Sequence, residues 1–193
     1  MSKNTLLIMP RIIKDRTGVH TNIDDKLLYP EIKAAQDMYI LPLLGSNLFN
    51  KLQNDIEAET LTGDYKDLMD DYIIDALINY VLAELPDGLS NQFWNRGLSK
   101  KTGDDTQPLS MTEMYNVVSK YRNRAEHYAK RCRMYLIQNG TAMFPEYSSV
   151  LVGADSIPPD RVSFVSPIYL GDMGIEIKVR DNPGYNSNDP IYL

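Results

Sequence analysis

The clearest pattern of apolar and polar positions in the chain covers residues 65–85. Apolar side chains recur there on one helical face, at Tyr65, Leu68, Met69, Tyr72, Ile73, Ala76, Leu77 and Tyr80. This spacing predicts an amphipathic helix from about Tyr65 to Leu85, ending before Pro86 and roughly 30 Å long. Ile74, Ile78 and Leu82 widen the apolar face, so we expect this helix to contact neighbours on more than one side.

A second helical pattern runs from Ser110 to Asn139. Its apolar stripe comprises Met111, Met114, Tyr115, Val118, Tyr121, Ala125, Tyr128, Ala129, Cys132 and Leu136. The pair Asn139-Gly140 is suited to ending a helix, so the predicted helix is about 45 Å long. We expect the whole stripe to face the core, although tyrosines on such a stripe also serve subunit interfaces.

The residues before these two helices predict shorter elements. Thr5 to Ile13 is apolar but interrupted by Pro10, which favours an extended arm or edge strand. After Asp24 and Asp25, a helix is expected from about Lys26 or Tyr29 to Ile40, where Pro42 would stop it. Its predicted buried stripe is Leu28, Ile32, Ala35 and Tyr39. Ser46 can then cap a short helix that carries Leu48, Phe49, Leu52 and Ile56.

Two segments lack a helical pattern. Residues 86–109 form a long connection, in which Phe93 and Trp94 are either a plug over the core, the favoured interpretation, or a docking anchor. After Gly140 the chain is rich in turn-forming residues, and a β-hairpin is predicted from Arg161–Tyr169 and Gly174–Arg180. The tail ends in Ile191, Tyr192 and Leu193 and is expected either to fray or to dock on a neighbour.

The predicted fold class is therefore mainly α. We expect an antiparallel helical bundle with two long amphipathic helices, an extended N-terminal arm (residues 1–22), a helical domain (23–140) and a C-terminal β-hairpin with an extended tail (141–193). The 193 residues, 43% of them hydrophobic and 24% charged, suit one globular domain with extensions. The longest apolar runs are too short to cross a membrane and the first residues open no signal peptide, so we expect a cytosolic, non-membrane protein.

Charge is distributed unevenly along a chain whose net charge is −6. An acidic block contains Asp55, Glu57, Glu59, Asp64, Asp67, Asp70, Asp71 and Asp75, with Lys66 as its one cation. The second long helix instead carries Lys120, Arg122, Arg124, Lys130, Arg131 and Arg133, against Glu113 and Glu126. Such opposite blocks favour pairing with each other, either within the chain or between neighbouring copies.

The sequence contains no P-loop, dinucleotide-binding fingerprint, zinc-ligand spacing or nucleophile elbow. His20 and His127 lie far apart, and Cys132 is expected to be a small buried hydrophobe. Asp67, Asp71 and Asp75 share one helical face and could bind a hard cation, but a solvated face is the favoured interpretation. We therefore predict no catalytic, cofactor-binding or metal-ligating residue and no enzymatic activity.

One segment resembles a known family. Residues 32–49 read IKAAQDMYILPLLGSNLF, with Ala35-Gln36, Tyr39-Ile40, Pro42 and Leu44-Gly45 at matching positions. This segment is similar to the opening of the head-to-tail connector proteins of tailed bacteriophages, especially of the crAss-like kind. The order that follows, an acidic long helix, a variable loop and a basic long helix, is also similar. The resemblance covers roughly residues 23–139, and the C-terminal part departs from smaller connectors.

The resemblance implies a structural virion protein assembled in the host cytoplasm. Such an adaptor forms a homo-oligomeric ring, typically of twelve copies, that docks on the portal protein, contacts other connector or tail proteins and extends the DNA channel. DNA would pass through without sequence-specific binding. Candidate interface residues are Phe93, Trp94, Arg122, Arg124, Arg131, Ile191, Tyr192 and Leu193, and Asp67, Asp70 and Asp71 are candidates for the channel wall. The alternative is a small helical binding or regulatory module that contacts nucleic acid through its basic helix.

Overall fold

A computed structural model describes residues 4–94, 97–100, 110–149 and 156–161, with the backbone alone for residues 87–94, 97–100 and 141. The chain divides into two compact units, Met1–Ser163 and Phe164–Leu193, and all described residues belong to the first. This unit is mainly helical, which confirms the predicted class. The β-hairpin predicted at Arg161–Tyr169 and Gly174–Arg180, apart from Arg161, lies outside the described residues, as do Ile191, Tyr192 and Leu193.

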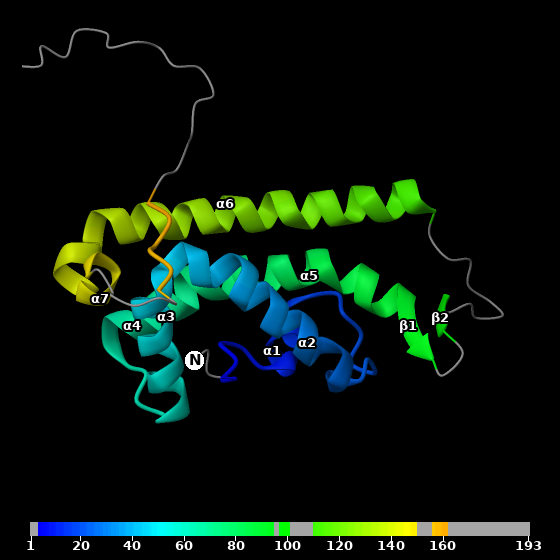
Figure 1. Ribbon diagram of the computed structural model, residues 1–193, viewed down its shortest axis with the longest axis horizontal. Coiled ribbons are helices and arrows are strands. Elements are labelled where there is room, and N and C mark those ends of the chain that lie inside the picture. Colours follow the sequence, from blue (N-terminus) through cyan, green and yellow to red (C-terminus); the bar gives the residue numbers. More distant parts are fainter. Residues whose placement is uncertain (1–3, 95–96, 101–109, 150–155, 162–193) are drawn as a thin grey trace, which may run out of the picture. The chain divides into compact units, whose positions relative to one another are not determined.

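The described elements follow one another along the chain in the order shown in Figure 1. They are α1 (Pro10–Arg16), α2 (Asp25–Ala35), the π-helical turn η1 (Gln36–Ile40), α3 (Leu41–Glu57), α4 (Gly63–Leu68), the π-helical turn η2 (Met69–Ile73), α5 (Ile74–Ser90), β1 (Asn91–Trp94), β2 (Gly97–Lys100), α6 (Met111–Met143) and α7 (Pro145–Ser148).

The prediction of an extended arm or edge strand for Thr5 to Ile13 is wrong from Pro10 onward. A helix, α1, begins at Pro10, which lies at its first position, where a missing N–H leaves no hydrogen bond unmade. The residues before it pack Leu7 and Ile8 into the core. The fully buried Gln36 holds this segment, because its Oε1 accepts from the Leu7 N–H at 3.0 Å and its Nε2 donates to the Thr5 carbonyl at 3.2 Å.

The helix predicted to stop at Pro42 continues through it. Asp24 caps α2, the chain passes through η1 without a break, and Pro42 sits in the first turn of α3. Pro42 costs this continuous helix one backbone hydrogen bond, and the helix continues despite the loss, so the predicted stop was wrong. The break comes at Gly45, whose φ of 76° and ψ of 157° are not helical. Leu28, Ile32 and Ala35 are buried as predicted, and so are Leu48, Phe49 and Leu52 after the break.

The first long helical pattern forms α4, η2 and α5. The helix passes Pro86 and ends at Ser90, later than predicted, because a proline near the end of a helix removes only one backbone hydrogen bond. As predicted, α5 packs on two sides, against α2 and against α6. The rings of Tyr39 and Tyr80 stack with centroids 4.1 Å apart on one side, and those of Tyr72 and Tyr135 stack at 4.2 Å on the other.

The connection between the long helices contains an antiparallel hairpin, in which Asn91 pairs with Lys100 and Trp94 with Gly97. The predicted plug or anchor role of Phe93 and Trp94 concerns side chains outside the described set. After the connection, Ser110 caps α6 in a reciprocal arrangement with Glu113.

The helix α6 runs past Asn139-Gly140 to Met143, so the predicted end was wrong. Gly140 serves packing instead, because a Cβ there would lie 2.7 Å from a ring carbon of Tyr147.

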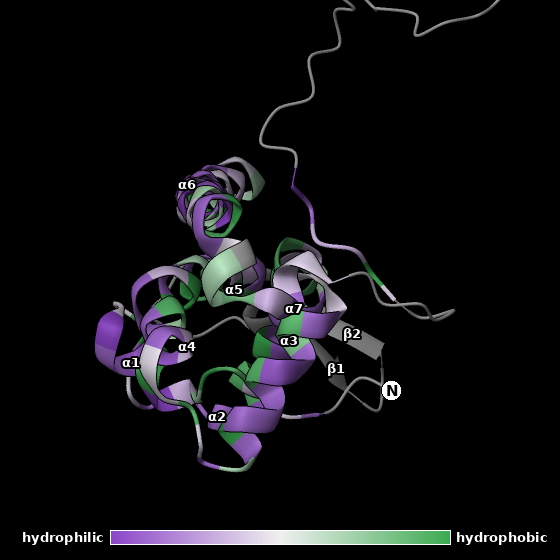
Figure 2. Ribbon diagram, turned by 90° about the vertical axis from the view of Figure 1, so that its left-hand side faces the viewer, coloured by the Kyte–Doolittle hydropathy of each residue, from purple (hydrophilic) through white to green (hydrophobic). Residues whose placement is uncertain are grey.

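The long helices α5 and α6 are antiparallel (Figure 1), since Tyr72 meets Tyr135 near one end and Glu84 meets Arg122 near the other. Seen along its axis, α6 lies at the outside of the described unit, with α5 directly beneath it (Figure 2). The described elements cover one flank of α6, and among the described residues of the other flanks Met111, Tyr115, Met134 and Ile137 are exposed large hydrophobic residues. None of the described helices has both the length and the apolar character needed to cross a membrane.

Candidate interaction surfaces

The acidic residues proposed for a channel wall lie exposed on α4 and η2. Asp67, Asp70 and Asp71 form no ion pair with any other described residue. Asp75 differs, because its Oδ1 lies 3.7 Å from Nη1 of Arg16. Within the described ranges, no group of three or more His, Cys, Asp or Glu side chains is placed to hold a metal ion. The structure therefore does not gather Asp67, Asp71 and Asp75 into a metal site.

The three candidate interface arginines of α6 have different surroundings. Nη2 of Arg122 lies 3.3 Å from a carboxylate oxygen of Glu84 on α5, so this cation pairs within the chain. The guanidinium of Arg131 lies 4.7 Å from the ring centroid of Tyr72, and that of Arg124 lies 5.8 Å from the ring centroid of Tyr121. All three side chains belong to exposed residues, and Arg124 has no ion pair with another described residue.

Basic and acidic residues meet where α6 crosses η2. Burial raises the pKa of Tyr135 on α6, and its neighbours Tyr72, Asp64, Asp67 and Asp71 raise it further. The two charge blocks are thus adjacent in space within one copy. Arg122 pairs inside the chain with Glu84, which lies outside the acidic block. Within the block, Asp55 pairs with Lys51 and Asp75 with Arg16, whereas Asp67, Asp70 and Asp71 form no ion pair with another described residue.

A polar cleft of about 740 Å³ lies where the end of α1, α5 and α6 meet. Its lining includes Arg16, Asp75, Arg124 and His127. The other histidine, His20, is in the α1–α2 connection, where its Nδ1 accepts from the Asn22 N–H at 3.1 Å. The two histidines thus lie in different surroundings, and no histidine-based catalytic arrangement is formed by the described side chains.

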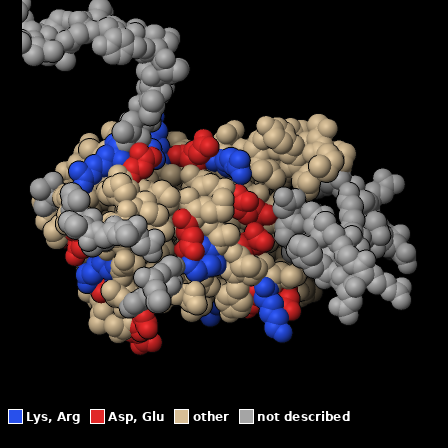
Figure 3. All heavy atoms as spheres, viewed as in Figure 1, with Lys and Arg blue, Asp and Glu red and all other residues tan. Residues whose placement is uncertain are grey.

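The start of α6 contradicts the expectation that its whole apolar stripe is core. Met111 and Tyr115 are 74% and 70% exposed, and Met114 and Val118 are only partly buried, whereas Ala125, Ala129, Cys132 and Leu136 farther along are buried. We call Met111, Met114, Tyr115 and Val118 the α6 apolar face. It borders a groove of about 550 Å³ whose other wall includes Ala83 and Glu84 of α5. Figure 3 shows uncharged surface over this end of α6, at the upper right.

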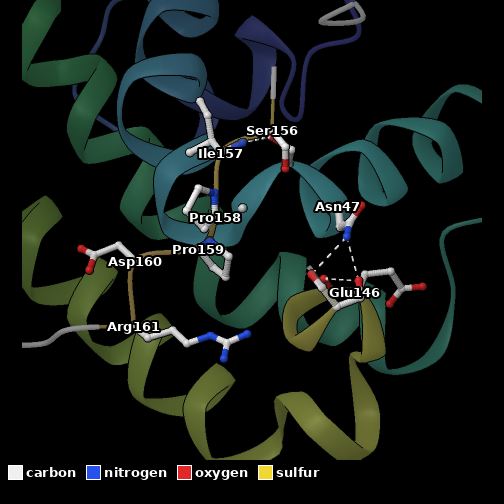
Figure 4. A pocket seen from close by; sticks show the side chains of 11 residues that line it. Asn47, Glu146, Ser156, Ile157, Pro158, Pro159, Asp160 and Arg161 are labelled. Carbon is white, nitrogen blue, oxygen red and sulfur yellow. Dashed lines mark hydrogen bonds between the residues drawn. The ribbon is translucent and has the colours of Figure 1, made fainter. Parts of the chain in front are cut away.

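The helix break at Gly45 holds an extended segment from far along the chain, Ser156–Arg161, which we call the strap (Figure 4). The Ser46 N–H donates to the Ile157 carbonyl and the Ile157 N–H donates to the Ser46 hydroxyl, both at 2.9 Å. The Asp160 N–H donates to the Pro42 carbonyl at 2.8 Å. The strap thus satisfies backbone groups that the helix break leaves without helical partners.

The strap also contacts the last helices. Arg133 of α6 donates through Nε to the Asp160 carbonyl at 3.0 Å and through Nη2 to its carboxylate at 2.8 Å. Arg161 donates to the Tyr147 carbonyl at 2.7 Å and its guanidinium lies 5.3 Å from the Tyr147 ring centroid. A cavity of about 590 Å³ lies beside the strap (Figure 4) and is lined partly by Asn47 and Glu146.

Sequence reasoning did not find this junction. The only local signal is Pro158-Pro159, which favours an extended backbone but does not indicate what that backbone contacts.

Comparison with known proteins assigns the chain to a family. A family of unknown function, DUF6712, matches residues 40–156, which is more than half of the chain. The protein belongs to the DUF6712 family. The DUF6712 region extends from the end of η1 to the first residue of the strap, so it contains the Gly45 break, the acidic block on α4 and η2, and the α6 apolar face. No curated protein and no solved structure matches the chain.

Proposed function

We propose that this DUF6712 protein is a non-enzymatic structural protein that assembles into a ring at the head-to-tail connector of a tailed bacteriophage. In this role it docks on the portal protein, extends the DNA channel and offers a platform for tail attachment. The resemblance of residues 32–49 to connector proteins supplies the biological context. The observation that carries the proposal is the α6 apolar face, whose Met111 and Tyr115 are 74% and 70% exposed at the start of α6, on a stripe that is buried from Ala125 onward.

Exposed apolar side chains grouped on one helical face mark a surface that another molecule covers, more than single exposed residues do. A ring protein needs two such surfaces, because head-to-tail contacts repeat around a closed symmetry axis. The proposed architecture also includes an antiparallel bundle, an N-terminal arm and, after residue 161, a β-hairpin and tail. In this proposal the arm, the hairpin and the tail are the segments that reach a neighbouring copy.

The acidic block fits the channel wall in this proposal. Asp67, Asp70 and Asp71 are exposed, and neutralising phosphates requires cations rather than carboxylates. A wall bearing these side chains would repel the DNA backbone and let it slide. A ring in which they lie on the outer rim would contradict this part of the proposal and leave ring assembly untouched.

The test is the assembly state of the purified full chain, alone and mixed with the portal protein, by light scattering and electron microscopy. We expect closed rings in at least one of the two conditions. Removing residues 182–193 should weaken ring formation without lowering the helical circular dichroism signal. A chain that stays monomeric at high concentration and never joins the portal would overturn the proposal.

The second candidate function is a nucleic-acid-binding module, and the exposed cations of α6 favour it. Lys120, Arg124 and Lys130 are exposed and form no ion pair with other described residues. Their phosphate contacts would give an affinity for duplex DNA that falls steeply with salt. Replacing all three by glutamine should then abolish that affinity, whereas the connector function predicts weak DNA binding by both forms.

A further inference from the structure

The stripe that α6 buries against α5 continues beyond the core onto the surface. Ala125, Ala129 and Cys132 are 0%, 7% and 0% exposed, but Met111 and Tyr115, on the same stripe nearer the helix start, are 74% and 70% exposed. Nothing in the described part of the chain covers these two side chains. The helix start is firmly held all the same, because Ser110 and Glu113 cap each other reciprocally.

The groove beside this face can accept side chains from another molecule. Its walls are Ala83 on α5 and Met114 and Val118 on α6, and it has a volume of about 550 Å³. Glu84 and Arg122, which form an ion pair at 3.3 Å, are also part of its lining. The site is therefore an apolar slot with a polar rim, which is the form of surface that binds a few large apolar residues.

The strap defines where the remaining chain starts. Arg133 holds Asp160 through two hydrogen bonds, and Arg161 is held by the Tyr147 carbonyl. Residues 162–193 follow and include the apolar segment Ile191-Tyr192-Leu193. With residues 162–180 assigned to the predicted hairpin, residues 181–193 still span up to roughly 40 Å when extended. Along α6, about 27 Å separates Arg133 from Tyr115, so chain length alone allows the segment to reach this face. The proposed ring favours the face of an adjacent copy over that of the same copy.

We propose that the α6 apolar face of one copy, together with its groove, receives Ile191, Tyr192 and Leu193 from a second copy. This rests on the proposed ring and names one of its contacts. The occupant matches the site in chemistry, because the segment offers two branched aliphatic side chains and one aromatic ring. The long residue span after a fixed root lets each copy deliver the segment to its neighbour, which makes the contact heterologous and able to close a ring.

The test is disulfide formation between full-length copies that each carry one added cysteine, Tyr115→Cys in one and Tyr192→Cys in the other. The native Cys132 is buried, and burial raises the pKa of its thiol to about 12, so it does not compete. We expect mixed dimers to form at assembling concentrations, identified by different mass tags. Met134→Cys, on the same helix and 43% exposed, is the matched control and should not link to Tyr192→Cys.

A second measurement compares Met111→Lys with Met134→Lys. Both side chains are exposed, so neither change should shift the midpoint of thermal unfolding appreciably. We expect Met111→Lys to raise the concentration needed for ring formation at least tenfold, and Met134→Lys to leave it unchanged. Equal effects of Met111→Lys and Met134→Lys on the concentration needed for ring formation would overturn the docking site.

Three outcomes separate this inference from the function on which it rests. Rings that form without the mixed disulfide and that tolerate Met111→Lys would overturn the docking site and leave the ring standing. A double variant that carries both Tyr115→Cys and Tyr192→Cys tests the alternative of binding within one copy. A disulfide that forms only within single chains of this variant would show that the occupant is not a second copy, which also overturns the docking site. Absence of any ring, with or without the portal, would overturn the proposed function itself.

Discussion

At the scale of single residues, Gly45 determines how two distant segments meet. Its φ of 76° lies in the region that glycine adopts without penalty, and a Cβ there would be 2.7 Å from Cδ of Pro159. We expect Gly45→Ala to lower the free energy of unfolding by about 2–4 kcal/mol, since backbone strain and a clash with the strap act together. Chemical denaturation monitored by circular dichroism measures this change.

Gly63→Ala is the matched control, because Gly63 also has a positive φ, of 58°, but nothing lies within 4 Å of a Cβ built there. Its expected cost is the backbone component alone, about 1–2 kcal/mol. The difference between the two variants combines the contact with Pro159 and the additional backbone strain of an alanine at the ψ of 157° that Gly45 adopts. Equal costs would mean that the strap does not press on Gly45 in solution.

Gln36 is a buried polar residue that the apolar pattern did not identify as structural. It is 0% exposed, and its amide satisfies the Leu7 N–H and the Thr5 carbonyl. Gln36→Met would keep the volume but leave the Leu7 N–H without that partner, whereas the Thr5 carbonyl keeps the hydrogen bond from Gln53 at 2.8 Å, so we expect a loss of about 1–3 kcal/mol. Gln138→Met, at an exposed position of α6, should change stability by less than about 0.5 kcal/mol. Urea denaturation of the two variants tests this, and equal midpoints would contradict it.

At the scale of elements, the start of α6 should depend on pH. Glu113 accepts hydrogen bonds from the hydroxyl and the N–H of Ser110, which lowers its pKa from 4.5. A carboxylate with a lowered pKa stabilises the fold above its ordinary pKa, and this contribution is lost as the pH falls through the folded-state pKa. We expect the amide protection of the first turn of α6 to decrease as the pH falls below about 4.5.

Hydrogen exchange of the peptide around Ser110, expressed as protection factors at several pH values, measures this effect. Glu113→Gln should remove the pH dependence, because a glutamine side chain does not titrate. Glu126→Gln, farther along the same helix, should keep it. An unchanged pH profile in Glu113→Gln would show that the cap does not control the helix start.

The sequence pattern predicted helix faces well, because burial of an apolar stripe depends on local spacing. Leu28, Ile32 and Ala35 were predicted correctly for this reason, as were Leu48, Phe49 and Leu52. The ends of helices were predicted less well. Pro42, Pro86 and Asn139-Gly140 are all compatible with a helix end, yet each lies inside a helix. At Gly140 the packing of Tyr147 supplies a reason that local sequence does not show.

The candidate surfaces were predictable only in part. Charge counts identified the exposed Asp67, Asp70 and Asp71, since charged residues are rarely buried without partners. The same counts could not show that Arg122 pairs with Glu84. Spacing also placed Met111 and Tyr115 on an apolar stripe without revealing that the stripe leaves the core. A periodic pattern states which side of a helix is apolar and leaves open what covers it.

At the scale of the whole molecule, we expect the charges of the acidic block to affect DNA retention by the assembled ring more than the stability of the fold. Asp67, Asp70 and Asp71 are exposed and lack ion pairs to other described residues, so replacing all three by asparagine should change stability little. We expect rings of this variant to retain DNA at salt concentrations that release it from the unmodified ring, because repulsion of phosphates is lost.

A filter-binding assay across a salt series measures DNA retention by assembled rings. Asp15→Asn, an exposed change on α1 outside the acidic block, provides the control. Identical retention by all three proteins would mean that the block does not face the DNA path.

The tyrosine pairs have an optical consequence. Rings stacked 4.1 and 4.2 Å apart couple their electronic transitions, so each pair should contribute to the near-ultraviolet circular dichroism. Tyr39–Tyr80 joins η1 to α5, and Tyr72–Tyr135 joins η2 to α6. Tyr80→Phe would reduce the circular dichroism contribution of the Tyr39–Tyr80 pair, and Tyr135→Phe would reduce that of the Tyr72–Tyr135 pair. The molecule therefore carries two built-in spectroscopic probes, one for each flank of its central helix, with which the docking of either flank can be followed in real time.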